Sequence, residues 1–271
     1  MTMELPLSYE RRGAGEPLVL LHGIGHHWQA WQPVLDRLAE THDVIAIDLP
    51  GFGRSPLPAA GLPQDMPQLV TAISEILDQL GLERPHVAGN SLGGAIALEL
   101  AAAGRVASAT ALSPAGFCTP RQLRRALWLL GMLRYAAHLP RPVLRATYRS
   151  SLLRAMSFGL LLSRPRRITA EAALADTLAL RNARAFRAVA RSGRRYGFRG
   201  APRVPVTIAW GTRDRILPYE GADLARELLP TATHIDLVGC GHVPMHDDPE
   251  LVAAVILSTT TAASPAREVS G

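Results

Sequence analysis

The chain has 271 residues, of which 48% are hydrophobic, and a formal net charge of +6. This length suits a single domain with a sizeable insertion, and the hydrophobic share suffices for a large buried core. The sequence contains no apolar run long enough for a transmembrane helix and no basic flank followed by an apolar stretch at its start. We therefore expect a cytoplasmic protein without stable membrane insertion.

The basic residues are all arginine, and they are concentrated in the middle of the chain. Residues 120–200 hold 18 of the 29 arginines beside only two acids, Glu171 and Asp176, a net charge of +16, whereas the rest of the chain carries −10. Such a block can meet nucleic acid, a membrane surface or an acidic ligand. The segment is rich in leucine and alanine rather than stacking aromatics, so we predict no nucleic-acid binding. A coding preference for arginine, with the charges solvated, is the plainer alternative.

Short apolar runs alternate with helix-like segments along most of the chain. The pattern predicts strands at 18–21, 44–47, 86–89, 109–112, 206–210 and 234–238, and helices at 29–40, 67–80, 92–103, 219–229 and 249–258. Near-continuous apolar strands separated by helices favour a mostly parallel, doubly wound α/β sheet that is covered on both faces. The segment LPLSYERRG near the start is expected to form an antiparallel edge.

The alternation breaks between residues 118 and 203, which are helical in character. We predict an α/β core over 1–117 and 204–260, an inserted α-helical cap over 118–203, and a disordered tail over 261–271. Within the insertion, 121–139 combines arginines with leucines and a tryptophan. A peripheral membrane contact is one hypothesis for it, but we favour a helix whose apolar face covers the cleft.

The stretch HVAGNSLGGA places Ser91 between two glycines, after an apolar run and before an alanine-rich helix. A turn this tight between strand and helix needs small neighbours and leaves the hydroxyl exposed at a helix N-terminus. The pentapeptide alone is weak evidence for a nucleophile, because glycine-flanked serines occur by chance. The strand–turn–helix setting makes it strong.

A serine needs a histidine base, and the histidine needs a group to orient it. His242 follows the last predicted strand and Asp214 follows the strand VTIAW, so both are expected at the same sheet edge as Ser91. Among the rival acids, Asp48 resembles a turn-organising residue, while Asp247 and Asp248 resemble helix caps. The order Ser91, Asp214, His242 therefore predicts a catalytic triad.

Acyl transfer also needs hydrogen-bond donors for the oxyanion. The glycine-rich turn LLHGIGHH follows the first apolar strand, so we predict that the backbone N–H groups of Ile24 and Leu92 form the oxyanion hole. We expect His22 to brace this loop rather than to catalyse. The predicted pocket residues are His26, Trp28, Asn90 and Val243.

Taken in order, HGIGHHWQAW, DLPGFGRS, GNSLGG, GTRD and GCGHVPMHDDPE resemble the α/β-hydrolase fold superfamily over about residues 17–257. The resemblance implies a serine triad with a helical cap at 118–203. Ser91 stands where epoxide hydrolases and haloalkane dehalogenases have an aspartate, which argues against both. The motif GNSLGG, with Asn90 before the serine, resembles the branch of the family that includes esterases, haloperoxidase-like enzymes and carbon–carbon bond hydrolases.

The function that follows is two-step hydrolysis of a small or medium acyl compound, with a carboxylic ester as the generic substrate and no metal or cofactor. One alternative is a thioesterase or C–C bond hydrolase whose arginine-rich cap attracts an anionic substrate. Another is a non-catalytic ligand receptor on the same fold. The sequence sets neither the acyl group nor the oligomeric state.

Overall fold

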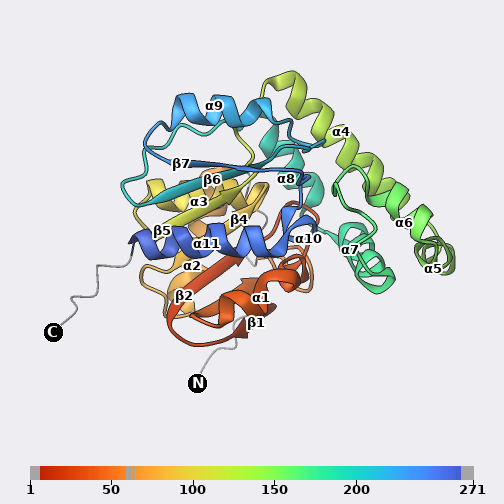
Figure 1. Ribbon diagram of the computed structural model, residues 1–271, viewed down its shortest axis with the longest axis horizontal. Coiled ribbons are helices and arrows are strands. Elements are labelled where there is room, and N and C mark those ends of the chain that lie inside the picture. The colour runs from red at the N-terminus through yellow and green to blue at the C-terminus, as the bar shows by residue number, and fades with distance from the viewer. Residues whose placement is uncertain (1–6, 59–60, 62, 64, 264–271) are drawn as a thin grey trace.

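The computed structural model describes residues 7–58, 61, 63 and 65–263. Seven strands form one sheet in the order β1-β3-β2-β4-β5-β6-β7 (Figure 1). β1 (Tyr9–Arg12) runs antiparallel to β3 (His42–Ile47) at one edge, and the other pairings are parallel. The predicted antiparallel edge is confirmed, although β1 pairs with β3 and not with the next strand along the chain.

The remaining strands are β2 (Glu16–Leu21), β4 (His86–Asn90), β5 (Ser108–Leu112), β6 (Val206–Gly211) and β7 (Thr233–Leu237). Each predicted strand lies within two residues of an observed one. Every residue of β4, β5 and β6 is buried, which explains why these strands read as continuous apolar runs rather than as alternating patterns.

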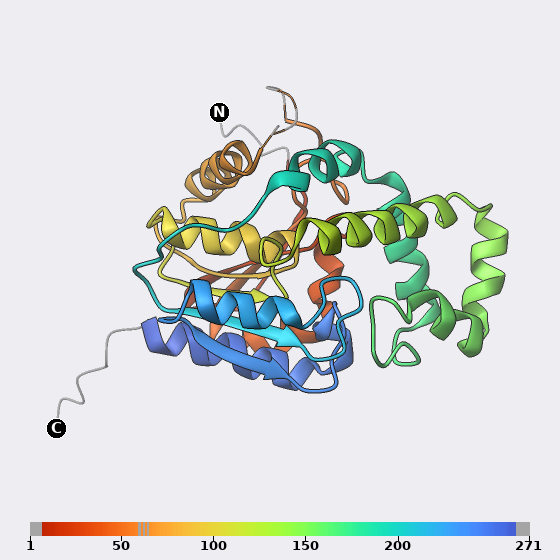
Figure 2. The same cartoon turned by 90° about the horizontal axis from the view of Figure 1, so that it is seen from above.

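Helices cover both faces of the sheet, as predicted (Figures 1 and 2). One face carries α1 (Gln32–Ala39), which follows the 3-10 turn η1 (Trp28–Trp31), together with α10 (Pro244–Asp247) and α11 (Pro249–Ala263). The other face carries α2 (Met66–Gln79), α3 (Leu92–Ala102) and α9 (Glu220–Leu228). Because α11 continues to Ala263, the first three residues of the predicted disordered tail are helical; the rest of that tail lies outside the described residues.

Between β5 and β6 the chain forms five α-helices and a short 3-10 turn. They are α4 (Pro120–Ala136), α5 (Arg141–Arg149), α6 (Ser151–Phe158), α7 (Ala170–Asn182), α8 (Phe186–Ser192) and η2 (Gly193–Arg195). We call residues 118–203 the insertion and the rest of the described chain the body. Figure 2 shows α4 to α7 extending beyond the end of the sheet. No helix within the described ranges combines the length and apolar character needed to cross a bilayer.

The long helix α4 begins where the sequence supplies a complete capping arrangement. The Thr119 hydroxyl accepts a hydrogen bond from the Gln122 N–H at 3.2 Å, and the Gln122 side chain accepts one from the Thr119 N–H at 2.9 Å. Pro120 occupies the first helical position, where its missing N–H costs nothing. These local signals fix the point at which the chain leaves the sheet for the insertion.

Candidate active site

Ser91 lies in a strained turn between β4 and α3. Its φ of 56° and ψ of −112° fall in a region that side-chain-bearing residues rarely adopt. A Cβ at Gly89 would collide with the carbonyl of Gly93, and a Cβ at Gly93 would collide with the carbonyl of Leu21 in β2. The two glycines therefore let α3 approach β4 and β2 closely enough for the turn to form.

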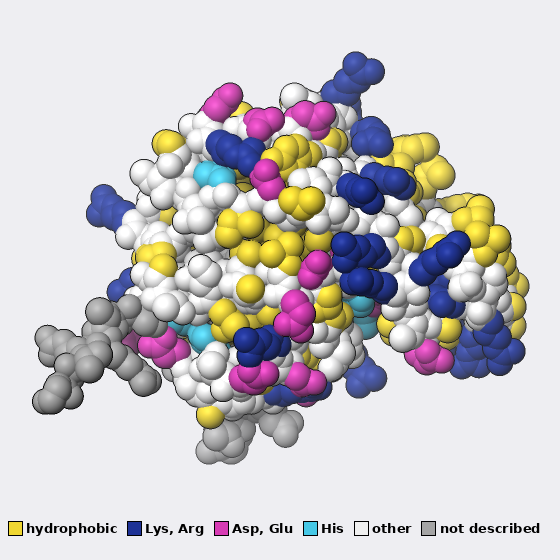
Figure 3. Space-filling model, in the orientation of Figure 1, with side chains coloured by type: hydrophobic (Ala, Val, Ile, Leu, Met, Phe, Trp, Pro, Cys, Tyr) yellow, Lys and Arg dark blue, Asp and Glu magenta, His cyan; other side chains and the backbone are white. Residues whose placement is uncertain are grey.

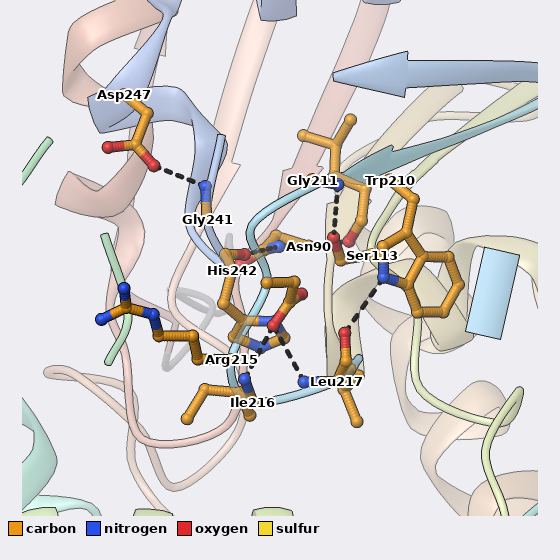
Figure 4. A network of polar contacts seen from close by, with 12 residues as sticks. Asn90, Ser113, Trp210, Gly211, Arg215, Ile216, Leu217, Gly241, His242 and Asp247 are labelled. Atoms are coloured by element: carbon orange, nitrogen blue, oxygen red, sulfur yellow. Dashed lines mark hydrogen bonds and ion pairs between the residues drawn. The ribbon is translucent and has the colours of Figure 1, made fainter. Parts of the chain in front are cut away.

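His242 and Asp214 meet in the loops that follow β7 and β6. The Nδ1 atom of His242 lies 2.7 Å from Oδ2 of Asp214, and both residues are buried. The other carboxylate oxygen of Asp214 accepts hydrogen bonds from the N–H groups of Ile216 at 2.8 Å and Leu217 at 2.9 Å (Figure 4). Because the carboxylate accepts at Nδ1, neutral His242 carries its proton there and leaves Nε2 as a proton acceptor.

The backbone of His242 is held from two sides. The Asn90 side-chain amide donates to the His242 carbonyl at 2.9 Å and to the Leu112 carbonyl at 3.1 Å, so it joins the strand before Ser91 to the His242 loop (Figure 4). From the insertion, the Leu161 carbonyl accepts the His242 N–H at 2.8 Å. The position of this histidine therefore depends on both parts of the chain.

A cavity of about 200 Å³ lies between the body and the insertion, and Ser91 and His242 both line it. Three of the four predicted pocket residues also line it: His26, Asn90 and Val243. Within the described part of the chain, no direct hydrogen bond joins the Ser91 hydroxyl to His242. In enzymes such bonds often tighten only when substrate binds. The remaining cavity wall is largely aliphatic and comes from α4, α5, α6 and α7.

Trp28 is not among the residues that line the cavity, contrary to our prediction. It begins η1, its N–H donates to Asp48 at 2.7 Å, and its side chain packs against the core beneath α1 and α11. The other carboxylate oxygen of Asp48 accepts the Arg54 N–H at 2.8 Å. Asp48 thus organises the turn after β3, as predicted.

The loop after β2 lies against Ser91. A Cβ on Gly23 would be 3.3 Å from the Ser91 Cβ, and both Gly23 and Ile24 line the cavity. Leu92 occupies the first position of α3, where an N–H has no acceptor within its own helix. Its side chain is buried in the core. These positions leave the two predicted oxyanion donors beside the serine.

His22 braces this loop from below. Its Nε2 accepts the Leu49 N–H at 3.0 Å and its Nδ1 donates to the Gly23 carbonyl at 2.7 Å, so the ring is neutral. Burial lowers its pKa to about 3, which keeps it neutral at ordinary pH. The contacts support a bracing role and not a catalytic one.

A cluster that the sequence did not single out lies further along the cavity wall. Asp176 of α7 accepts a hydrogen bond from Nε2 of His27 at 2.8 Å, and its second oxygen is 3.9 Å from Nε2 of His26. Asp176 and His26 line the cavity. Because these partners are 149 residues apart, only the fold brings them together; the one hint in the sequence was the scarcity of acids in the insertion.

The charge state of this cluster follows from its surroundings. Burial lowers the pKa of His26 to about 4 despite the nearby carboxylate, so its ring is neutral near pH 7. Burial alone would raise the pKa of Asp176, but the adjacent histidines hold it below its usual value, so Asp176 is ionised. The donor atoms of His26, His27 and Asp176 lie within 4.8 Å of one another, close enough to hold one small cation. The His27 hydrogen bond already gives the carboxylate a partner without one.

Asp247 differs from our prediction of a helix cap. Its carboxylate is fully buried and accepts from the N–H groups of Ser163 at 3.0 Å and Arg164 at 2.6 Å. It also accepts from the Gly241 N–H at 2.7 Å (Figure 4). It therefore ties the His242 loop to the insertion. Asp248 alone caps α11, through the Leu251 N–H at 3.2 Å.

Comparison with known proteins places this geometry in context. Residues 18–255 match the model of the Alpha/beta hydrolase family. A dihydrolipoyllysine-residue acetyltransferase component of the acetoin cleaving system from Cupriavidus necator is 39% identical over 41% of this chain and 30% of its own length. The uncharacterized protein Rv2715 of Mycobacterium tuberculosis is 29% identical over 89% of this chain and 74% of that protein. The crystal structure of a membrane phospholipase A is 26% identical, with a TM-score of 0.69, and covers 95% of this chain and 83% of that one.

Proposed function

The chain belongs to the alpha/beta hydrolase family, and on that premise we propose that it is a serine hydrolase acting on carboxylic esters with apolar acyl groups. The observation that carries the proposal is the pairing of His242 with Asp214 at 2.7 Å, on the wall of a cavity that also holds Ser91 in its strained turn. Backbone strain of this kind is concentrated at functional sites, which supports a role for the Ser91 turn.

The mechanism uses the three side chains and two backbone amides. Nε2 of His242 takes the Ser91 proton as the Ser91 oxygen attacks the ester carbonyl, and Asp214 stabilises the resulting imidazolium. The Ile24 and Leu92 N–H groups stabilise the oxyanion. The tetrahedral intermediate then collapses, the proton passes from His242 to the departing alcohol, and an acyl-serine remains. Water, deprotonated by His242, attacks this ester and releases the carboxylic acid and free Ser91.

The cavity lining supports an apolar acyl group rather than an anionic one. Its wall is mainly aliphatic, with Leu130, Leu144 and Phe158 among its side chains. None of the 18 arginines of residues 120–200 is among the described residues that line it, and its one carboxylate is Asp176. A buried carboxylate disfavours a second negative charge nearby. These features weigh against the alternative of a thioesterase or C–C bond hydrolase that draws an anionic group into the site.

A burst assay with p-nitrophenyl esters of increasing acyl length tests the proposal. We expect a burst of nitrophenol followed by turnover, with the best rates at medium chain lengths, and we expect both to disappear in Ser91→Ala. A loss of about 10⁴-fold or more is typical when a serine nucleophile is removed.

Absence of turnover with every ester, in protein shown to be folded by circular dichroism, would contradict the proposal. The C–C hydrolase and the non-catalytic receptor would then be the readings to pursue. The two differ in whether a substrate with a cleavable C–C bond is consumed or only bound.

A further inference from the structure

The insertion exposes an unusual amount of large apolar side chain. Eleven such residues are exposed in the described chain, and eight of them lie between 128 and 156: Trp128, Met132, Tyr135, Leu139, Val143, Leu152, Leu153 and Met156. Figure 3 shows hydrophobic side chains along the outer edge of the insertion with arginines among them. Single exposed apolar residues need no explanation, but such a concentration marks an interaction surface.

Helix α4 has exposed apolar residues on the face that points away from the cavity. Trp128, Met132 and Tyr135 are spaced to share one helix face, and Tyr135 is 85% exposed. The opposite face supplies Leu130 and Leu133 to the cavity wall. A helix that only covers a cleft needs one apolar face. The second apolar face of α4 is therefore free to contact something outside the chain.

The charged residues between 121 and 156 are all of one sign. No aspartate or glutamate occurs between Glu99 and Glu171. Six arginines of α4 and α5 are exposed: Arg121, Arg124, Arg125, Arg141, Arg145 and Arg149. A second copy of the chain docking through the same surface would bring two such surfaces together and suffer like-charge repulsion. Arginines interleaved with Trp, Tyr, Leu and Met instead match the headgroup and acyl boundary of an anionic bilayer.

We propose that residues 121–156 form a docking surface for anionic phospholipid membranes. The same three helices, α4 to α6, line the cavity with their inner sides, and Leu139 is both exposed and part of the cavity wall. Docking therefore brings the lipid phase next to the cavity that holds Ser91. An apolar ester dissolved in the bilayer would have a short path to the site.

Vesicle sedimentation with Ser91→Ala protein tests docking apart from any hydrolysis. Vesicles contain phosphatidylcholine alone or with about one third phosphatidylglycerol. We expect binding to the anionic vesicles at low salt and much weaker binding in 0.5 M NaCl, because salt screens the arginines. Equal binding to both vesicle types, or no binding to either, would overturn the proposal.

Matched variants of the insertion and the body distinguish binding through this surface from non-specific binding. Trp128→Asp combined with Tyr135→Asp should weaken vesicle binding about tenfold or more, because two interfacial aromatics are lost. Leu228→Asp, on an exposed leucine of α9 in the body, should leave it unchanged. Similarly, Arg145→Gln should weaken binding about fivefold and Arg84→Gln on the body should not. Equal effects of the insertion and body variants would contradict the assignment of the surface.

Two further measurements distinguish membrane docking from a damaged active site and from self-association. With Ser91 intact, the Trp128/Tyr135 variant should hydrolyse soluble short-chain p-nitrophenyl esters at the normal rate, since neither residue lines the cavity. Sedimentation velocity should show one unchanged mass for the native chain and this variant. If the native chain is a dimer that the variant converts to monomers, and native vesicle binding is absent, the surface joins copies of the chain and the membrane proposal is wrong.

Discussion

Two aspartates each hold a histidine beside the same cavity, one in the body and one reaching from the insertion, and they do so in opposite orientations. In the body, His242 lines the cavity and Asp214 lies behind it, with 2.7 Å between Nδ1 and Oδ2. At the insertion, Asp176 lines the cavity and His27 lies behind it, with 2.8 Å between their atoms. The body thus presents a proton acceptor, whereas the insertion presents a negative charge.

The two Asp–His pairs suit different chemical roles. A histidine backed by a carboxylate becomes a stronger base, which serves bond breaking. A carboxylate backed by a histidine stays ionised inside a mostly apolar wall, and we expect it to disfavour substrates that bring a second negative charge there. The net charge of the insertion is opposite to the charge that it presents to the cavity. Residues 120–200 carry +16, and the rest of the chain carries −10. None of the described arginines of the insertion lines the cavity, whereas Asp176, its single cavity-lining carboxylate, does.

The largest difference between the two pairs should appear in catalysis. We expect Asp214→Asn to lower kcat for p-nitrophenyl esters by about 10⁴-fold, because an amide in that place favours the wrong His242 tautomer. Steady-state kinetics on the purified variant measures this. A loss below tenfold, with the fold intact, would mean that Asp214 does not orient the base.

Paired glycine substitutions extend the comparison to the backbone. Gly93→Ala forces a Cβ into the Leu21 carbonyl, so we expect the free energy of unfolding to fall by more than about 3 kcal/mol. Gly131→Ala in α4 meets no atom within 4 Å and should raise it by about 0.5 kcal/mol. Urea unfolding followed by circular dichroism measures both. Equal effects would show that the turn at Ser91 is less tightly constrained than its geometry indicates.

Removing the charge from the insertion's pair should alter selectivity more than rate. We expect Asp176→Asn to change kcat/KM for a neutral medium-chain ester by less than about tenfold. For an ester whose acyl chain ends in a carboxylate, the same ratio should rise about tenfold, because the repelling charge has gone. Competition between the two esters gives the ratio directly. An unchanged ratio would indicate that Asp176 serves only to join the insertion to the body.

The last predicted effect is on the dependence of stability on pH. Burial lowers the pKa of His22 to about 3 and that of His26 to about 4, from 6.5. Between those values and pH 6.5 the unfolded chain binds more protons, so the free energy of unfolding falls as pH falls, by about 1 kcal/mol per pH unit for each histidine. His22→Gln should flatten this slope between pH 6 and 4.5, and His138→Gln on the exposed surface should not. Urea midpoints across the range measure it; identical slopes in all three proteins would contradict the assignment.

The sequence sufficed to predict the strands and the Asp214–His242 pair, because there the local pattern and the chemistry agree. Each strand lies within two residues of its prediction, and Asp214 and His242 meet because carboxyl ends of parallel strands share an edge. The Asp176–His27 contact depends on how the insertion packs, which no motif encodes. Asp247 was misassigned because its sequence position suits a cap, whereas its actual partners, such as Ser163, come from the insertion. Trp28 was misplaced because its side chain packs against the apolar core, which its local sequence does not reveal.

The bond between the His242 N–H and the Leu161 carbonyl, 2.8 Å long, has a consequence for protein engineering. Leu161 belongs to the insertion, and Asp247 adds contacts from the same region to the loop that carries His242. Exchanging residues 118–203 for the corresponding segment of another protein would thus remove a backbone anchor of His242 unless the graft also supplied a carbonyl at this point. Chimeras designed to transplant specificity should therefore keep residues 161–164 native and vary α4 to α6 alone.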